Sequence, residues 1–172
     1  MRQSETWILQ AKSDLDVALA LVKDDNFSTY CQALAKYQQT TEKSIKGMIA
    51  ALKELGFSGF TFGGTHTLEP EIKHLDVLRR RPDLPSVQEI NRIAVGHRSD
   101  ILRLCSLAPR MPGQGQIFAR NTEYPFNDTS VGTWTAPAAE GAFSIEEVRK
   151  AHRTAWRVHH RAAKFTASLS RR

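Results

Sequence analysis

The feature that most constrains the fold of this chain is a long apolar stripe with helical spacing. Its members recur about every 3.6 residues through residues 27–55, which is typical of one face of a single amphipathic helix. Gly56 follows directly and suits the left-handed residue that ends a helix. A helix of this length favours a helical bundle. The members of its stripe are Phe27, Leu34, Ile45, Met48, Leu52 and Leu55.

Polar side chains interrupt and flank this stripe. Gln38 and Thr41 lie inside it, while Gln39, Glu42 and Lys46 form a polar row beside it. Glu42 precedes Lys46 by four residues, the favourable direction for an ion pair on a helix. Two interpretations are open. Either Glu42 and Lys46 form an ordinary surface pair and the other polar groups find partners inside the bundle, or Gln38, Gln39, Glu42 and Lys46 face a neighbouring chain.

Periodic apolar residues predict four further helices. Serine followed three residues later by glutamate gives capping-box spacing at Ser86 and Glu89, and again at Ser144 and Glu147. Ser4 is a candidate N-cap of the first helix. No strand-like alternation or internal repeat persists, so an all-α bundle of about five helices is predicted. The four helices cover residues 5–23, 70–80 and 86–108 and a C-terminal segment that opens at Ser144.

The last two helices are separated by a long stretch without a periodic pattern, residues 108–143. A loop of this length is uncommon in a compact domain unless it binds something or is mobile, and its aromatic residues argue against disorder. We therefore predict a long ordered loop. Within it, Arg120 and Tyr124 are candidates to hold a nucleotide by charge and stacking. The alternative is that Arg120 packs against its own loop.

Length and composition limit the class of protein. The 172 residues and 19.3 kDa fit one domain, residues 1–172, with a core large enough to fold unaided. Cys31 and Cys105 lie among apolar helical positions and are predicted to be buried thiols in a reducing compartment. No apolar run has the length of a signal peptide or a membrane span. A cytoplasmic protein without membrane contact, cofactor or metal is expected.

Positive charge is concentrated at the C-terminal end. The formal net charge is +6, and residues 145–172 carry eight basic and two acidic side chains, which accounts for the whole excess. On the predicted helix the basic side chains lie opposite the apolar stripe, as either a solvated face or a surface that binds phosphates. His152 and His159 flank Trp156 near the apolar side and are expected to be packing residues. The basic row consists of Arg149, Arg153, Arg157, His160 and Lys164.

Several short motifs follow one another in the order found in a known family. Trp7 is followed by DLDVALAL, YCQALAKYQQTTEKSIKGMI at residues 30–49, THTLEPEIKHL at residues 65–75, ARNTEYPF at residues 119–126 and a helix that opens with FSIEE. In this order they resemble the HEPN domain family, whose second helix commonly reads like QQAxEKxxKAxL. The resemblance implies a small helical bundle, a homodimer, and binding of nucleic acid or nucleotide in toxin–antitoxin or antiviral defence.

The same resemblance implies a second function. Many HEPN domains are metal-independent ribonucleases that use an arginine, four to six intervening residues and a histidine, and Arg92 and His97 have this spacing. The arginine would hold the scissile phosphate, and the histidine would exchange protons with the ribose. On a regular helix, however, five residues turn through about 140°, which would point Arg92 away from the apolar stripe that includes His97.

Three functions are therefore open at this point. The first is binding of nucleic acid or nucleotide, and the second is RNA cleavage by Arg92 and His97. If His97 is instead a core residue and Arg92 a solvated one, no catalysis follows. The third function is a non-catalytic interaction module whose basic helix binds an acidic partner protein, for example an adjacent protein of the nucleotidyltransferase type.

Overall fold

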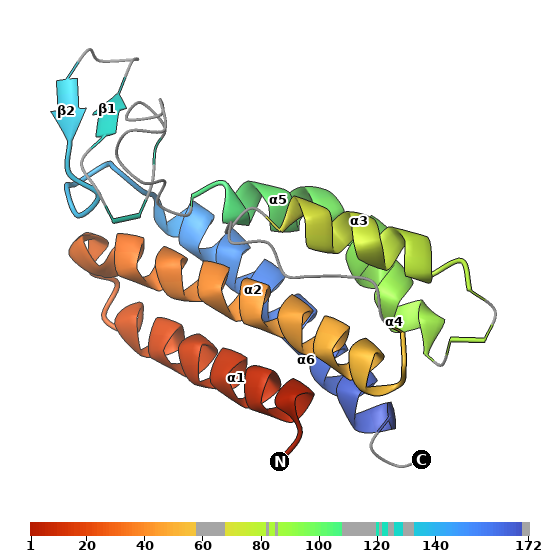
Figure 1. The fold of residues 1–172 in the computed structure, drawn as a ribbon. Helices are drawn as coiled ribbons and strands as arrows, with labels where there is room; N and C mark the ends of the chain where they lie inside the picture. The colour runs from red at the N-terminus through yellow and green to blue at the C-terminus, as the bar shows by residue number, and fades with distance from the viewer. Residues whose placement is uncertain are drawn as a thin grey trace.

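The computed structural model describes residues 1–57, 68–81, 83–84, 86–107, 120, 122–123, 126–128 and 133–169. These residues form an all-α bundle, which confirms the predicted fold class (Figure 1). A 3₁₀ turn, η1 (Phe27–Thr29), precedes α2, and a π-helical turn, η2 (Arg92–Gly96), joins α4 to α5. The α-helices are α1 (Gln3–Leu21), α2 (Tyr30–Glu54), α3 (Glu69–Leu78), α4 (Val87–Asn91), α5 (Arg98–Cys105) and α6 (Ile145–Leu169).

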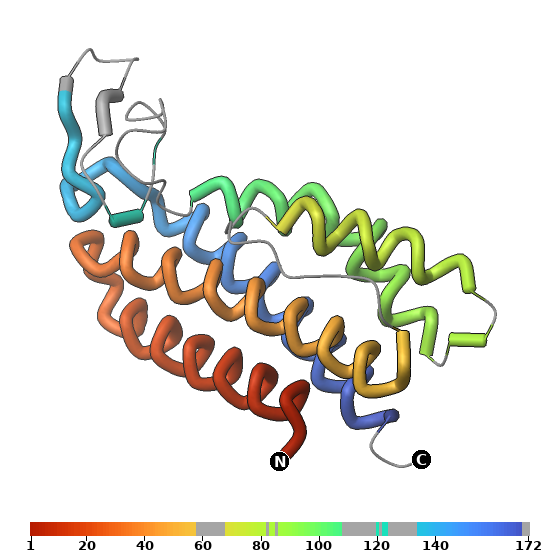
Figure 2. The backbone as a smooth tube through the Cα atoms, in the orientation of Figure 1, coloured from red at the N-terminus to blue at the C-terminus, as the bar shows by residue number. Residues whose placement is uncertain are grey.

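The two longest helices, α2 and α6, form the centre of the bundle. Helix α2 packs against both α1 and α6. Figure 2 shows that α1 and α2 run in opposite directions, whereas α2 and α6 run in the same direction. Helices α3 and α5 contact α2, and helices α4 and α5 contact α6. One face of α6 remains exposed to solvent.

The core consists of two clusters of buried apolar side chains. One lies between the C-terminal halves of α2 and α6 and the helices α3, α4 and α5, and it includes Phe165 and Cys105. The other joins the N-terminal halves of α2 and α6 to α1, and it includes Tyr37 and Cys31. Both cysteines are buried, as predicted. Within the described ranges, no helix combines the length and the apolar character needed to cross a membrane.

Helices α1 and α2 approach closely at Gly47. A Cβ atom there would lie 2.8 Å from Ile8 Cδ1 and 3.3 Å from Trp7 Cβ. We expect Gly47→Val to lower the free energy of unfolding by about 1–3 kcal/mol, because overpacking pushes the two helices apart. Gly47→Ala is expected to be nearly neutral, because the Ile8 side chain can shift and alanine recovers about 1 kcal/mol of helix propensity. Urea unfolding checks both, and a valine variant as stable as the wild type would contradict this packing.

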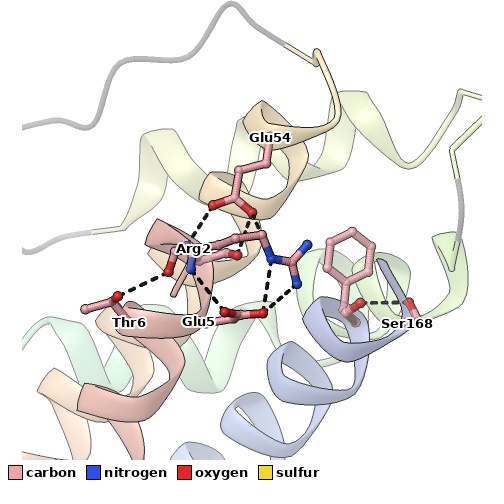
Figure 3. A network of polar contacts seen from close by, with 7 residues as sticks. Arg2, Glu5, Thr6, Glu54 and Ser168 are labelled. Carbon is pink, nitrogen blue, oxygen red and sulfur yellow. Dashed lines mark hydrogen bonds and ion pairs between the residues drawn. The ribbon is translucent and has the colours of Figure 1, made fainter. Parts of the chain in front are cut away.

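The N-terminus of α1 is held by a side chain from the far end of α2 (Figure 3). The helix begins at Gln3, so Ser4 lies in its first turn and is not the predicted N-cap. Ser4 donates from its backbone N and from Oγ to the Glu54 carboxylate, at 2.9 and 2.7 Å. Arg2 donates from its backbone N to Glu5 at 3.0 Å. Carboxylates are favoured here by the free N–H groups and by the helix dipole, so the tertiary contact from Glu54 adds to the local cap that Glu5 provides.

The two predicted capping boxes have different outcomes. Glu147 N donates to Ser144 Oγ at 3.2 Å and Ser144 N donates to Glu147 Oε2 at 2.9 Å, which confirms the box at the start of α6. The prediction of a capping box at Ser86 was wrong, because the Ser86 side chain forms no capping hydrogen bond. Ser86 has a left-handed φ of 57°, and its hydroxyl lies 3.0 Å from that of Ser168 in α6. The carboxylate of Glu89 binds cations of α6 instead of capping its own helix.

The helix predicted over residues 86–108 is interrupted in its middle. Helix α4 ends at Asn91, the π-helical turn follows, and α5 ends at Cys105. The apolar side chains before, within and after the turn are all buried. A wider turn therefore changes the direction of the polar residues without removing the apolar ones from the core. The buried side chains of this stretch are Ile90, Ile93, Ala94, Ile101, Leu104 and Cys105.

The long loop contains a short element that the sequence pattern did not predict. Strands β1 (Phe126–Asp128) and β2 (Thr133–Thr135) pair in antiparallel fashion. Three residues per strand are too few to show a period of two. After β2 the chain packs onto the bundle, where Ala142 and Phe143 are buried. Residues 108–119 of the predicted ordered loop lie outside the described residues.

Gly56 ends α2 as predicted. It has a left-handed φ of 87°, a conformation that glycine adopts without steric cost. Gly56 N donates to Lys53 O at 2.9 Å and Phe57 N donates to Leu52 O at 3.0 Å. These two hydrogen bonds form a Schellman motif, which satisfies carbonyl groups that the helix end would leave free.

Candidate functional site

The outward face of α6 carries a row of exposed basic side chains. It extends from Arg149 to Lys164, a length of about 22 Å at 1.5 Å per residue. Carboxylates occur only in the first turn of this helix. The structure places all five residues of the predicted row on the exposed side of α6: Arg149, Arg153, Arg157, His160 and Lys164.

An aromatic pair lies in the middle of this row. The Trp156 side chain is 50% exposed, and its ring stacks on that of His160 with centroids 5.3 Å apart and planes 4° apart. The prediction that Trp156 lies near the apolar side was therefore wrong. Steps of three residues from Arg153 and four residues to His160 place it on the outward face, so the signal was present in the sequence. We name six residues the α6 basic face: Arg149, Arg153, Trp156, Arg157, His160 and Lys164.

The guanidinium groups of the α6 basic face form no ion pair within the described ranges. No residue in the described part of the chain forms an ion pair with Arg149, Arg153 or Arg157. On the flank of the same helix the situation differs, since Arg161 pairs with Glu89 at 3.2 Å. Unpaired cations on one exposed face produce a positive potential that attracts anions.

Three cations share one buried carboxylate at the C-terminal end of the α6 basic face. Glu89 is 5% exposed and lies 3.3 Å from Arg92, 3.2 Å from Arg161 and 3.3 Å from Lys164. Burial alone would raise the pKa of Glu89, but the hydrogen bonds and charges of Lys164 and Arg161 outweigh it and hold the pKa below its ordinary 4.5. The ionised carboxylate orients the three cations, and positive charge remains in excess around it.

Of the two residues predicted as catalytic, Arg92 is the first residue of the π-helical turn and His97 directly follows its last residue. Such a turn closes hydrogen bonds between residues five apart, so the roughly 140° expected for a regular helix does not apply here. The Arg92 guanidinium pairs with Glu89 at 3.3 Å, and the charges that affect the pKa of His97 are those of Arg157, Arg161 and Asp100. Arg92 is exposed and His97 is half-buried rather than in the core. Burial lowers the pKa of His97 below its ordinary 6.5, and the charges of Arg157 and Arg161 lower it further, while Asp100 opposes them. A neutral imidazole therefore lies beside the α6 basic face.

No family model, curated protein or solved structure matches this chain. The similarity to HEPN domains thus rests on the short sequence motifs and on their order. What the protein binds has to be argued from the charges, exposure and contacts of its own residues.

Arg120 is held by its own surroundings. Its guanidinium forms two hydrogen bonds with the Glu147 carboxylate, at 2.6 and 2.9 Å, and a third with the carbonyl oxygen of Ala142. It also lies over the Phe143 ring, 4.3 Å from the centroid. This is the packing alternative, in which Arg120 ties the end of the loop to the start of α6. Tyr124 lies outside the described residues, so its role in ligand binding stays a prediction.

The polar residues of α2 bind one another within the chain. Gln38 and Glu42 are both buried, and Gln38 Nε2 donates to Glu42 Oε2 at 3.0 Å. Lys46 forms the predicted ion pair with Glu42 at 2.6 Å, and Gln39 accepts a hydrogen bond from Lys36 at 3.0 Å. These contacts favour the interpretation in which the polar groups are satisfied inside the bundle. Their role as an interface stays a prediction.

The chemistry available at the site is charge, stacking and one neutral imidazole. Among the described residues, no group of three or more His, Cys, Asp or Glu side chains is placed to hold a metal ion. Arginine side chains bind phosphate oxygens through two parallel donors, and an exposed indole offers a flat face to a base. The site is therefore suited to a ligand that combines phosphates with aromatic rings.

Proposed function

We propose that the protein binds single-stranded nucleic acid, RNA in the first instance, through the α6 basic face. The observation that carries this proposal is the stack of Trp156 on His160, between guanidinium groups that have no ion-pair partner in the described part of the chain. Proteins that bind single strands combine a positive track for the backbone with aromatic rings for the bases. The α6 basic face has both features on one helix.

The dimensions of the face support a strand of several nucleotides. Its length of about 22 Å follows from 15 residues at 1.5 Å each. At about 3.4 Å per stacked nucleotide, this corresponds to roughly six nucleotides, within the range of about 4–16 that single-strand binding modules cover. The contacts are to phosphates and ring faces, so little sequence preference is expected.

An acidic protein partner would also meet the cations of this face. It would leave the half-exposed Trp156 and the parallel His160 ring without a specific role, which is why we favour nucleic acid. The homodimer, the toxin–antitoxin or defence setting and a nucleotidyltransferase-type partner remain predictions from the resemblance to HEPN domains.

Replacing Trp156 tests the stacking part of the proposal. We expect Trp156→Ala to weaken binding of a single-stranded RNA by about 5- to 150-fold, which corresponds to the loss of one stacked base at about 1–3 kcal/mol. Fluorescence anisotropy at fixed salt measures the change. The matched control is Trp134→Ala, because Trp134 is also exposed, at 60%, but lies on β2. Equal losses in both variants, or none in either, would overturn the assignment of the bases to this face.

RNA cleavage is a second candidate function, favoured by one observation. Burial, and then the charges of Arg157 and Arg161, lower the pKa of His97, so a neutral imidazole lies near these two arginines. A neutral histidine can take the proton of a ribose 2′-hydroxyl while an arginine holds the phosphate. This function would use RNA that the α6 basic face has bound, so it adds to the first proposal.

The cleavage function is tested with a pool of single-stranded and structured RNA in EDTA. If it operates, His97→Ala and Arg92→Ala will each reduce metal-independent cutting by about 10²–10⁴-fold, the usual contribution of one acid–base group. Arg103→Ala, an exposed arginine of α5, is the control and should cut like the wild type. Intact RNA after incubation with the wild type, while binding is retained, would exclude this candidate and leave a binding protein.

A further inference from the structure

A pocket opens at the N-terminal end of the α6 basic face, where α6 meets the C-terminal end of α1. Its volume is about 390 Å³, which is within the usual range of about 300–1,000 Å³ for small-molecule sites. Arg149 and Arg153 of the α6 basic face lie at its edge together with Lys23. The pocket and the face are therefore parts of one continuous surface.

Two side chains that line the pocket carry polar atoms without partners. Tyr37 is fully buried, and its hydroxyl has no hydrogen-bond partner among the residues that the structure describes. Nδ1 of His152 is likewise buried and unpaired, and the two rings pack edge to face with centroids 5.5 Å apart. Buried polar groups are almost always satisfied, and each exception calls for an explanation such as a missing ligand. Both exceptions here adjoin the same pocket.

The protonation states of these two groups are fixed by their surroundings. Burial raises the pKa of Tyr37 to about 12, so its hydroxyl remains a hydrogen-bond donor. Burial, and then the charge of Arg153, lowers the pKa of His152 below its ordinary 6.5. A neutral imidazole can donate or accept at Nδ1, depending on the tautomer. The Tyr37 hydroxyl can therefore donate to one atom of a ligand, while His152 Nδ1 donates to, or accepts from, a second atom.

The remaining walls limit what such a ligand can be. Leu19, Val22, Ile145 and Val148 are the apolar lining residues. Exposed charged residues also line the pocket: the cations Lys23, Arg149 and Arg153, and one carboxylate, Asp25, which accepts a hydrogen bond from Tyr30. A fatty acid would place its apolar end against the Tyr37 hydroxyl and leave that group unsatisfied. A free phosphate ion would leave the apolar sides in contact with water. A flat heterocycle with hydrogen-bonding atoms at one end and a phosphate at the other fits the polar groups, the apolar sides and the cations of the pocket.

We infer that this pocket receives the terminal base of the nucleic acid strand bound to the α6 basic face. The base lies between the apolar walls, with its polar edge toward Tyr37 and His152, and its phosphate meets Arg149 and Arg153. The inference rests on the proposed function, because the same two arginines hold the strand. It adds a preference for strand ends that contacts with phosphates alone do not supply.

The experiment compares three RNA decamers of one sequence in competition against a labelled RNA. One is intact, one has an abasic 5′-terminal nucleotide and one has an abasic 3′-terminal nucleotide, so all carry the same phosphates. We expect the wild type to bind the intact decamer about 5- to 150-fold more tightly than one of the abasic decamers, the range for a base in an aromatic site. Free nucleoside monophosphates are tested in parallel and are expected to compete only weakly.

Two variants assign this discrimination to the pocket. Tyr37→Phe removes one buried hydroxyl without a partner, so the free protein should remain as stable as the wild type or become more stable. The preference for the intact decamer should fall by about 2- to 12-fold, as expected for one hydrogen bond. His152→Gln should reduce it as well. His159→Gln is the control, because His159 lies seven residues further on the same flank of α6 and lines a different groove.

Each outcome decides a different point. Discrimination that falls in Tyr37→Phe and is unchanged in His159→Gln supports the pocket, and discrimination that is equal in Tyr37→Phe and the wild type overturns it. Equal binding of all three decamers by the wild type overturns the pocket and leaves the proposed function standing. Absence of RNA binding overturns the proposed function and the pocket together. Tight binding of a free nucleoside monophosphate that survives loss of Arg157 shows a small-molecule site and overturns the claim of a strand end.

Discussion

Replacement of Arg149, Arg153 and Arg157 by glutamine will weaken binding of single-stranded RNA by about 500-fold at about 50 mM salt and by about 30-fold at about 200 mM. The three guanidinium groups are exposed and have no ion-pair partner among the described residues. Each contact between a cation and a phosphate of a single strand contributes about 0.7 to the slope of log K against log salt. Three lost contacts therefore flatten this slope by about 2.

The salt dependence separates this prediction from a loss of folding. A variant that is partly unfolded loses a similar fraction of its binding at every salt concentration. A variant that lacks three phosphate contacts loses most at low salt. Because the three arginines are exposed and unpaired, their replacement should change the free energy of unfolding by less than about 0.5 kcal/mol per site. Urea unfolding of the triple variant checks this.

A control variant keeps the net charge of the triple variant but spares α6. Lys12, Lys73 and Arg80 lie on or directly after other helices, and each is exposed. Glutamine at all three positions also removes three positive charges. We expect a much smaller change in affinity and an unchanged salt slope. A control variant that loses as much binding as the α6 variant would show that net charge alone is responsible, and the α6 basic face would lose its assignment.

The features that the sequence predicted correctly depend on neighbours along the chain. The capping box of Ser144 and Glu147, the left-handed Gly56 and the ion pair of Glu42 with Lys46 each involve residues at most four positions apart. Helical periodicity works for the same reason, since it registers which side of an element is buried. The all-α fold and the exposed basic row followed from these local signals.

The features that the sequence missed depend on contacts between distant elements. Glu89 has the spacing of a capping residue, but Arg161 and Lys164 of α6 bind its carboxylate. The interrupted helix around Arg92 and His97 and the pocket at Tyr37 arise likewise where separate helices meet. Ser4 follows the same rule, since Glu54 replaces its expected role. A residue's local preference for a cap or a regular helix is overridden where a tertiary contact is more favourable.

The second large effect is expected at Glu89. Glu89→Ala should lower the free energy of unfolding by about 2–4 kcal/mol, at the low side of the range for breaking a buried ion pair because its cationic partners are partly exposed. For a protein of this size, this corresponds to a fall in the melting temperature of about 4–16 °C. Glu89→Gln keeps the shape of the side chain and one acceptor oxygen, so it should lower the free energy of unfolding by less than Glu89→Ala. Urea unfolding at neutral pH measures both.

The pH dependence isolates the charge of Glu89 from its shape. Its pKa in the folded protein is held below the ordinary 4.5. The unfolded chain therefore takes up the proton first, and acid favours unfolding. The advantage of the wild type over Glu89→Gln is fully present well above pH 4.5 and disappears as the pH falls through the folded pKa. A difference between the two proteins that stays constant from pH 7 to pH 3 would contradict the ion-pair account.

Stability and nucleic acid binding should respond in opposite directions to this substitution. Glu89→Gln removes a negative charge beside Arg92, Arg161 and Lys164, so the positive potential at this end of the α6 basic face increases. Affinity for RNA at low salt should then be equal to or higher than that of the wild type, although the protein is less stable. Loss of both properties would mean that Glu89 holds the cations in the geometry that phosphates need. Opposite changes would mean that it serves the fold and restrains the binding surface.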